Sequence, residues 1–124
     1  MVHLRGHHTV PETLERLESA LRAHGLNIFG RVDHSGEAAK VSLTMRPAQV
    51  LVFGSPKAGT PLMVAAPTLA IDFPLKALAW EDAGGAVWLS YNSPEYLARR
   101  HNVADGLIKN IAGAGAFLKQ AAEP

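Results

Sequence analysis

The chain has 124 residues, of which 48% are hydrophobic and 19% are charged, and its formal net charge is +1. This is the composition of a globular domain, and the lack of a basic run argues against a nucleic-acid partner. Because the chain has no cysteine, disulfides, thiolate catalysis and cysteine-ligated metal sites are excluded. A chain of this length forms one core, so we expect a single domain over residues 1–124.

The sequence shows no signal for a membrane. No apolar run approaches the ~20 residues of a membrane span, and the segment from Met1 to Thr9 lacks the apolar centre of a signal peptide. We therefore expect a cytoplasmic protein without a membrane partner. Residues 3–9 alternate only weakly in polarity, so this segment is either a short first strand or an arm.

The first clear element is a helix from Pro11 to His24. Thr9 and Glu12 have the spacing of a capping box, proline suits the first helical turn, and Gly25 ends the run. Leucines recur at helical spacing at positions 14, 17 and 21. This stripe predicts an amphipathic helix.

A strand is expected from Leu26 to Val32, where residues alternate and Gly30 permits another backbone to approach closely. Asp33 and His34 follow it directly, so they lie at a strand end. Residues 37–40 can form one helical turn.

Another strand is expected at Val50–Phe53, a continuous apolar run typical of a strand covered on both faces. We predict that it is the central strand. A turn over Gly54–Gly59 follows it. Thr60 then fits a helix N-cap and Pro61 a first helical residue, so a helix is expected from Leu62 onward.

The second half of the chain predicts a hairpin and two helices. Strands at Leu75–Glu81 and Ala86–Tyr91, joined by a glycine-containing turn, form a β-hairpin that carries both tryptophans. Ser93 caps a helix that ends near His101. A last amphipathic helix is expected from about residue 105 to 121, weakened by its glycines. Together the elements predict an α+β domain with a mainly antiparallel sheet and helices packed on it.

Several short motifs resemble those of one bacterial and archaeal family. In chain order they are Arg31-Val-Asp-His34, Arg46-Pro47, Phe53 to Met63, Leu75-Lys-Ala-Leu78, Trp88-Leu-Ser-Tyr91 and Tyr96 to His101. Their order and spacing resemble the family called domain of unknown function 302, over about residues 9–103. The resemblance implies a small α+β domain with an antiparallel sheet, commonly found as a homodimer, with no assigned activity.

The segment from Gly54 to Thr60 is a candidate ligand site. It joins a strand to a helix start, where backbone amides and the helix dipole can hold a phosphate or carboxylate, and Lys57 adds a cation beside Gly59 and Thr60. It is not a Walker A loop, because Thr60 stands where that motif needs lysine and Pro56 stiffens the backbone. The alternative interpretation is a tight turn that needs its glycines and prolines for backbone reasons.

Two histidines and one arginine are further candidates. His34 follows Asp33 directly, so their side chains point to opposite faces of an extended backbone and do not pair. Through the fold His34 could meet His101, giving a general base or a ligand to metal or haem. Capping or bonding to backbone carbonyls is the alternative role for these histidines. Arg46 could clamp a ligand carboxylate or pair with an acidic residue of the chain.

These residues support three hypotheses. The first is a homodimeric domain that binds a small anionic ligand in a cleft formed by the Asp33-His34 strand end, the Gly54–Thr60 turn and the helix ending at His101. The second is a His-dependent enzyme or a metal- or haem-binding protein that uses His34 and His101. The third is a structural or partner-binding module whose surface is the tryptophan hairpin. The sequence names no cofactor and indicates no dedicated metal site, and it leaves open whether the chain is an enzyme.

Overall fold

Helices and strands alternate along the first part of the chain in the computed structural model, which describes the backbone of residues 1–124 and every side chain except that of Asp105. In chain order the elements are β1 (Val2–Arg5), α1 (Val10–Ala23), β2 (Asn27–Asp33), α2 (His34–Lys40), β3 (Ala48–Gly54), α3 (Pro56–Ala65), the 3-10 helix η1 (Pro67–Ile71), β4 (Leu75–Glu81), β5 (Val87–Tyr91), α4 (Pro94–His101), α5 (Asp105–Ala112) and α6 (Ala114–Ala122).

The strands form one antiparallel sheet of five strands in the order β1-β5-β4-β3-β2. This confirms the predicted α+β fold and the predicted hairpin of β4 and β5. The central strand is β4, so the prediction that Val50–Phe53 is central is wrong. β3 lies second from the edge because β2 pairs along it and has no further neighbour among the described strands.

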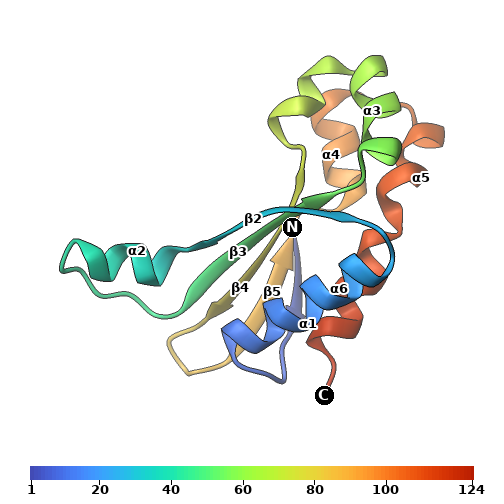
Figure 1. Cartoon of the computed structure of the whole chain (residues 1–124). Helices are drawn as coiled ribbons and strands as arrows, with labels where there is room; N and C mark the ends of the chain where they lie inside the picture. Colours follow the sequence, from blue (N-terminus) through green and yellow to red (C-terminus); the bar gives the residue numbers. More distant parts are fainter.

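The core lies between one face of the sheet and the pair α1 and α6 (Figure 1). The predicted capping box begins α1: the Thr9 hydroxyl accepts from the Glu12 amide, and the Glu12 carboxylate accepts from the Thr9 amide, each at 3.3 Å. Below it the leucine stripe is buried. The core comprises mainly Val10, Leu14, Leu17, Leu21, Leu51, Phe53, Ala77, Ala79, Leu89 and Leu118.

The opposite face of the sheet, which we call the open face, carries no helix in the described part of the chain (Figure 1). Cross-strand partners share a face, and the register places Val32, Val50 and Leu78 in one row and Trp80 and Trp88 in the next. Val32 is exposed and the other side chains of these rows are half-buried, whereas Leu51 and Phe53 on the core face are buried. The apolar run of β3 is therefore apolar on both faces but covered on only one.

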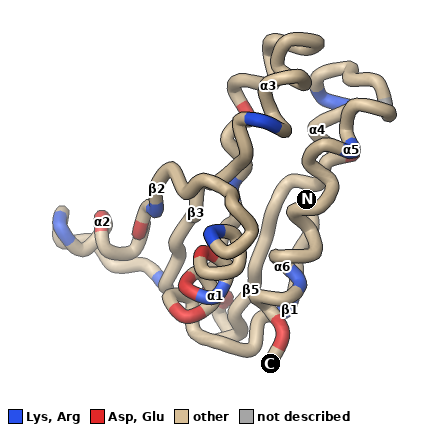
Figure 2. The backbone as a smooth tube through the Cα atoms, turned by 45° about the vertical axis from the view of Figure 1, so that its right-hand side comes forward, with Lys and Arg blue, Asp and Glu red and all other residues tan. Residues whose placement is uncertain are grey.

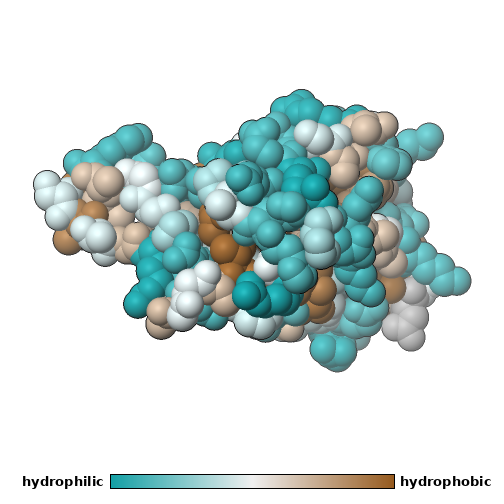
Figure 3. All heavy atoms as spheres, turned by 90° about the horizontal axis from the view of Figure 1, so that it is seen from below, coloured by the Kyte–Doolittle hydropathy of each residue, from teal (hydrophilic) through white to brown (hydrophobic). Residues whose placement is uncertain are grey.

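The segment of residues 34–47 projects from the end of the sheet, and we call it the arm (Figure 1). It contains α2 and the extended chain that returns to β3. The Asp33 carboxylate caps α2 by accepting from the Gly36 amide at 3.0 Å and the Ser35 hydroxyl at 2.7 Å. The remainder of the arm exposes Leu43 and Met45. Figure 3 shows apolar side chains at its tip.

Helix α3 begins earlier than the sequence predicts. Its N-cap is Ser55, whose hydroxyl accepts from the Ala58 amide at 3.3 Å, and Pro56 is its first residue. The predicted turn over Gly54–Gly59 is thus mostly helix, with Pro61 inside it. The chain has two consecutive cap-and-proline signals, and the first one forms the helix, in which Pro61 lacks the N–H that would donate to the carbonyl of Lys57.

The predicted last helix is divided into two, α5 and α6, at Gly113. Helix α5 packs on α3 and α4, whereas α6 packs on α1 and the sheet. The break lets one amphipathic stripe serve two clusters: Ile111 belongs to the small core under α3 and α4, and Leu118 to the main core.

Charged residues are scattered over the elements (Figure 2). Arg31 of β2 lies 3.5 Å from the carboxylates of Glu15 and Glu18 on α1.

Within the described residues, no helix has the length and apolar character needed to cross a membrane.

Candidate ligand pocket

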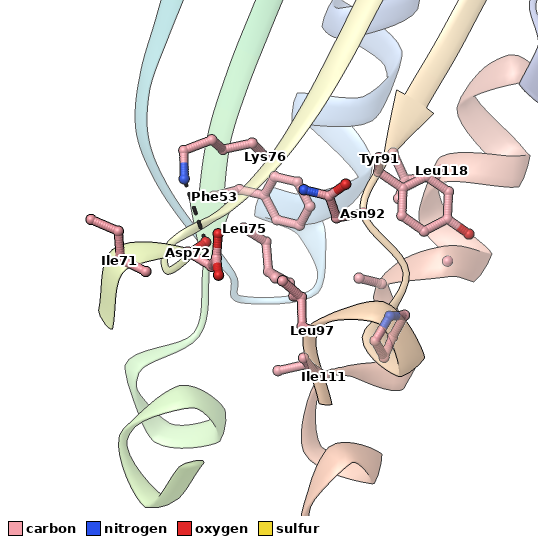
Figure 4. A pocket seen from close by; sticks show the side chains of 13 residues that line it. Phe53, Ile71, Asp72, Leu75, Lys76, Tyr91, Asn92, Leu97, Ile111 and Leu118 are labelled. Carbon is pink, nitrogen blue, oxygen red and sulfur yellow. Dashed lines mark hydrogen bonds between the residues drawn. The ribbon is translucent and has the colours of Figure 1, made fainter. Parts of the chain in front are cut away.

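A pocket of about 300 Å³ lies where the sheet meets α4, α5 and α6 (Figure 4). Its wall is mainly apolar, because apolar side chains at the ends of the strands and on the packed helices line it. The lining residues that matter for its chemistry are Phe53, Leu75, Leu97 and Leu118 as apolar walls, with Asp72, Lys76, Tyr91 and Asn92 as polar groups.

Lys76 supplies a positive charge at this pocket. Its ammonium donates to the backbone carbonyls of Asp72 at 3.4 Å and Pro74 at 3.2 Å, and it forms no ion pair with a described side chain. Carbonyl oxygens carry only partial charges, so the charge of Lys76 stays uncompensated. An acidic group in the pocket would offset it.

The carboxylate of Asp72 is already occupied. One oxygen accepts from the Arg100 guanidinium at 3.0 Å, and the other is in close contact with Nε2 of His101. With Nε2–H donated to Asp72, Nδ1 of His101 accepts from the Thr68 hydroxyl at 2.8 Å. The side chain of His101 is only 5% exposed and that of Asp72 14%, so this network holds η1 and the loop after it against α4.

Burial and the nearby carboxylate of Glu95 raise the pKa of Tyr91. Its hydroxyl also faces the small residue Gly115 of α6: a Cβ added to Gly115 would lie 3.2 Å from that oxygen. At neutral pH Tyr91 is therefore a neutral hydroxyl that can donate to a ligand.

A second pocket of about 210 Å³ adjoins the first, since Leu75 and Ile111 line both. It lies at the N-terminal end of α3 and is bordered by Gly54, Gly59 and Thr60. Gly59 is buried, and a Cβ added there would contact the Phe73 ring at 3.5 Å. The pocket is lined largely by apolar side chains, among them Phe29, Met63 and Phe73.

The structure divides the predicted site residues into two groups. The first group lies at the end of β3 that adjoins the arm: Asp33 ends β2, and His34 and Arg46 lie on the arm itself. The other group, Lys57, Gly59, Thr60 and His101, lies on α3 and α4 at the opposite end of the molecule (Figure 1). One chain therefore does not bring His34 and His101 together.

The second group is itself only partly assembled. Gly59 and Thr60 line the second pocket, whereas Lys57 is exposed in the first turn of α3 and borders neither cavity. His101 stands behind Asp72 rather than in the pocket wall.

Sequence reasoning did not assign Asp72, Lys76 or Asn92 to the ligand site. None of them belongs to a local motif that signals binding. They lie close together because the first residues of β4 and the last residues of β5 are at the same end of the sheet. The nearest signal was the polar Lys76 inside the otherwise apolar start of a strand.

The remaining predicted acid, Asp33, has a local role. Hydrogen bonds from the Ser35 hydroxyl and the Gly36 amide lower its pKa, so it is ionised at neutral pH as a helix cap. Among the described residues, no group of three His, Asp or Glu side chains is arranged to hold a metal ion.

Comparisons with known proteins place these features in context. The family model for the domain of unknown function DUF302 matches residues 2–121. A crystal structure of an uncharacterized conserved DUF302 protein from Bacillus stearothermophilus has a TM-score of 0.83 to this chain at 17% identity, covering 98% of this chain and 97% of that one. The same arrangement of helices and strands thus occurs in both.

Curated relatives in Brucella are similar over nearly the whole chain. The fluoride-specific ion channels FluC 1 of Brucella suis and FluC 2 of Brucella melitensis are each 40% identical to it over 126 residues. The match covers 98% of this chain but 50% and 47% of those proteins. The chain therefore spans about half the length of these relatives.

Proposed function

We propose that this chain, which belongs to the family of the domain of unknown function DUF302, is a homodimeric domain that binds a small anionic ligand in the pocket beside Lys76. The observation that carries the proposal is the pocket of about 300 Å³, with apolar walls and Lys76, Tyr91 and Asn92 around them. Sites for small molecules are typically concave and mostly apolar, with a few polar groups that orient the ligand.

The charges around the pocket favour an acid as the ligand. The carboxylate of Asp72 is neutralised by Arg100 and bound by His101, so it does not balance the charge of Lys76. A carboxylate or similar acidic group on Lys76, with donors from Tyr91 and Asn92, would place an apolar body against Phe53 and Leu97. The ligand class is therefore a small amphipathic acid.

A fluorescent acid tests this assignment. Anilinonaphthalene sulfonate, which combines an aromatic body with one acidic group, should bind the wild-type chain and bind Lys76→Met about tenfold more weakly. Lys57→Met is the matched control, since Lys57 is an exposed lysine that borders neither cavity, and it should bind like the wild type. The assignment would be wrong if all three proteins bound the dye equally well, or if the Lys57 variant alone lost binding.

The homodimer is supported by the open face of the sheet. Trp80 and Trp88 stack there with ring centroids 6.5 Å apart, beside Val50 and Leu78. Aromatic side chains are enriched at protein interfaces, and two sheets pack well face to face at about 10 Å. A second copy of the chain would bury this face by the same contacts on both sides.

A second candidate function is an accessory role next to a fluoride channel. The similarity to half of the Brucella channels favours it. In this role the chain would associate with a channel polypeptide or sense fluoride. Fluorine-19 NMR of fluoride with the purified chain should then show line broadening that saturates at a stoichiometric ratio. An unchanged fluoride line, together with no co-purification of a channel polypeptide, would dismiss this role.

A further inference from the structure

Exposed apolar side chains gather at the two ends of β3, far apart in one chain. The arm carries Leu43, 65% exposed, and Met45, 46% exposed. At the other end, around the two pockets, Phe29 is 54% exposed and Ile71 is 72% exposed. The open face lies between the two groups (Figure 1).

A two-fold axis can bring these two ends together. Ala48, at the base of the arm, pairs with Trp80, and Phe53, at the edge of the pockets, pairs with Leu75. The midpoint between these two levels of the sheet is next to Leu78, in the central strand. If two open faces pack about a two-fold axis that crosses the strands there, strand order is kept and strand direction is reversed. Each arm then lies at the pocket end of the other copy.

Charge and polarity oppose the other face-to-face orientation. If the strands of the two copies ran in the same direction, Lys76 would lie opposite the partner's Lys76, and Asp82 would lie opposite the partner's Asp82. Like charges directly opposite each other are destabilising. That orientation would also place the apolar arm on the partner's β1 edge, where His3 and Arg5 are exposed and polar. The orientation with reversed strand direction, which we call the crossed orientation, separates the equal charges and places the apolar arm against the exposed apolar side chains Phe29 and Ile71.

We propose that in the homodimer the arm of each copy covers the pocket end of its partner, with Leu43 and Met45 against Phe29 and Ile71, and that Arg46 of the arm joins Lys76 of the other copy as a second cation for the ligand. The inference rests on the proposed homodimer and its pocket. Arg46 is exposed and forms no hydrogen bond or ion pair with a described residue of its own chain, so its guanidinium is available to a ligand acid. The ligand site is thus built from two chains.

The lack of cysteine in the chain allows a direct cross-linking test. The double variant Leu43→Cys/Ile71→Cys, treated with a short bismaleimide, should give a covalent dimer whose linked peptides join the arm to η1. Neither single variant should form a covalent dimer, because each position is distant from the equivalent position of the partner chain. A link between Leu43→Cys and Arg5→Cys, in a second double variant, would overturn the crossed orientation.

Two further measurements separate failure of this inference from failure of the dimer or of the pocket. Position 78 lies next to the axis, so the bismaleimide should join two chains of the Leu78→Cys variant through this position. If no such cross-link forms and the protein sediments as a monomer, both the proposed dimer and the proposed arm contact are overturned. Arg46→Met should weaken binding of anilinonaphthalene sulfonate about tenfold, whereas Lys40→Met on the same arm should not. Unchanged binding by Arg46→Met, alongside weakened binding by Lys76→Met, overturns the role of the arm and leaves the pocket proposal standing.

Discussion

The imidazole of His101 contacts the carboxylate of Asp72, and this pair joins the last turn of α4 to the loop that follows η1. Both side chains are largely buried, and the same carboxylate also accepts from Arg100. The wall of the pocket therefore depends on a polar contact between segments 29 residues apart.

Replacing Asp72 should destabilise this wall. Asp72→Ala leaves the buried His101 without its partner and the Arg100 guanidinium without its carboxylate, so we expect the free energy of unfolding to fall by about 1–3 kcal/mol. Urea unfolding followed by circular dichroism measures the loss. Glu37→Ala, which removes an exposed ion pair with Lys40 on the arm, should cost well under half as much. Equal losses in the two variants would contradict the structural role of Asp72.

Two glycines at the start of α6 should respond differently to alanine. Gly113 has helical angles, with φ −66° and ψ −19°, and open space where a Cβ would lie. Gly113→Ala should therefore raise stability by up to about 1 kcal/mol. At Gly115 the added Cβ would stand 3.2 Å from the Tyr91 hydroxyl, so the gain should be smaller or reversed. Thermal unfolding of both variants checks this, and a larger gain at Gly115 would refute the contact.

The β4–β5 turn should lose stability in acid because of Asp82. The Trp88 indole N–H and the amides of Ala86 and Gly84 donate to its carboxylate and lower its pKa. A pKa that is lower in the folded than in the unfolded state gives stability that is present above the ordinary value of about 3.9 and is lost as the pH falls through the folded value.

The variant Asp82→Asn tests that pH dependence. The amide has no carboxyl proton to gain, so stability should fall less between about pH 5 and about pH 2 than in the wild type. Urea unfolding at a series of pH values, followed by tryptophan fluorescence, gives both curves. If the two curves are parallel, the hydrogen bonds to Asp82 do not contribute to acid sensitivity.

The proposed homodimer should be sensitive to charge on the open face. Leu78→Asp would bury a carboxylate at the axis of the dimer without a partner, which is strongly unfavourable. We expect a folded monomer in sedimentation and circular dichroism. Ser19→Asp, on the exposed side of α1, should leave the oligomeric state unchanged. A dimeric Leu78→Asp would show that the open face is not the interface.

Local elements were predictable because their signals are local. The capping box at Thr9, the leucine stripe of α1 and the glycine turn between β4 and β5 each rest on residues a few positions apart, and all are present in the structure. Where the chain offers two local signals, Ser55-Pro56 and Thr60-Pro61, the sequence analysis predicted a helix start at the second, and that prediction is wrong. The structure uses the first.

The amino-acid sequence by itself determined the family, the α+β class and the positions of most helices and strands, because backbone hydrogen bonding and hydrophobic periodicity act over short stretches of chain. Only the tertiary structure decided the order of the strands, which face stays open, and that Lys76, Tyr91 and Asn92 border one pocket while His34 and His101 lie apart. Those relationships depend on contacts between residues distant along the chain, and no short pattern specifies how distant segments meet.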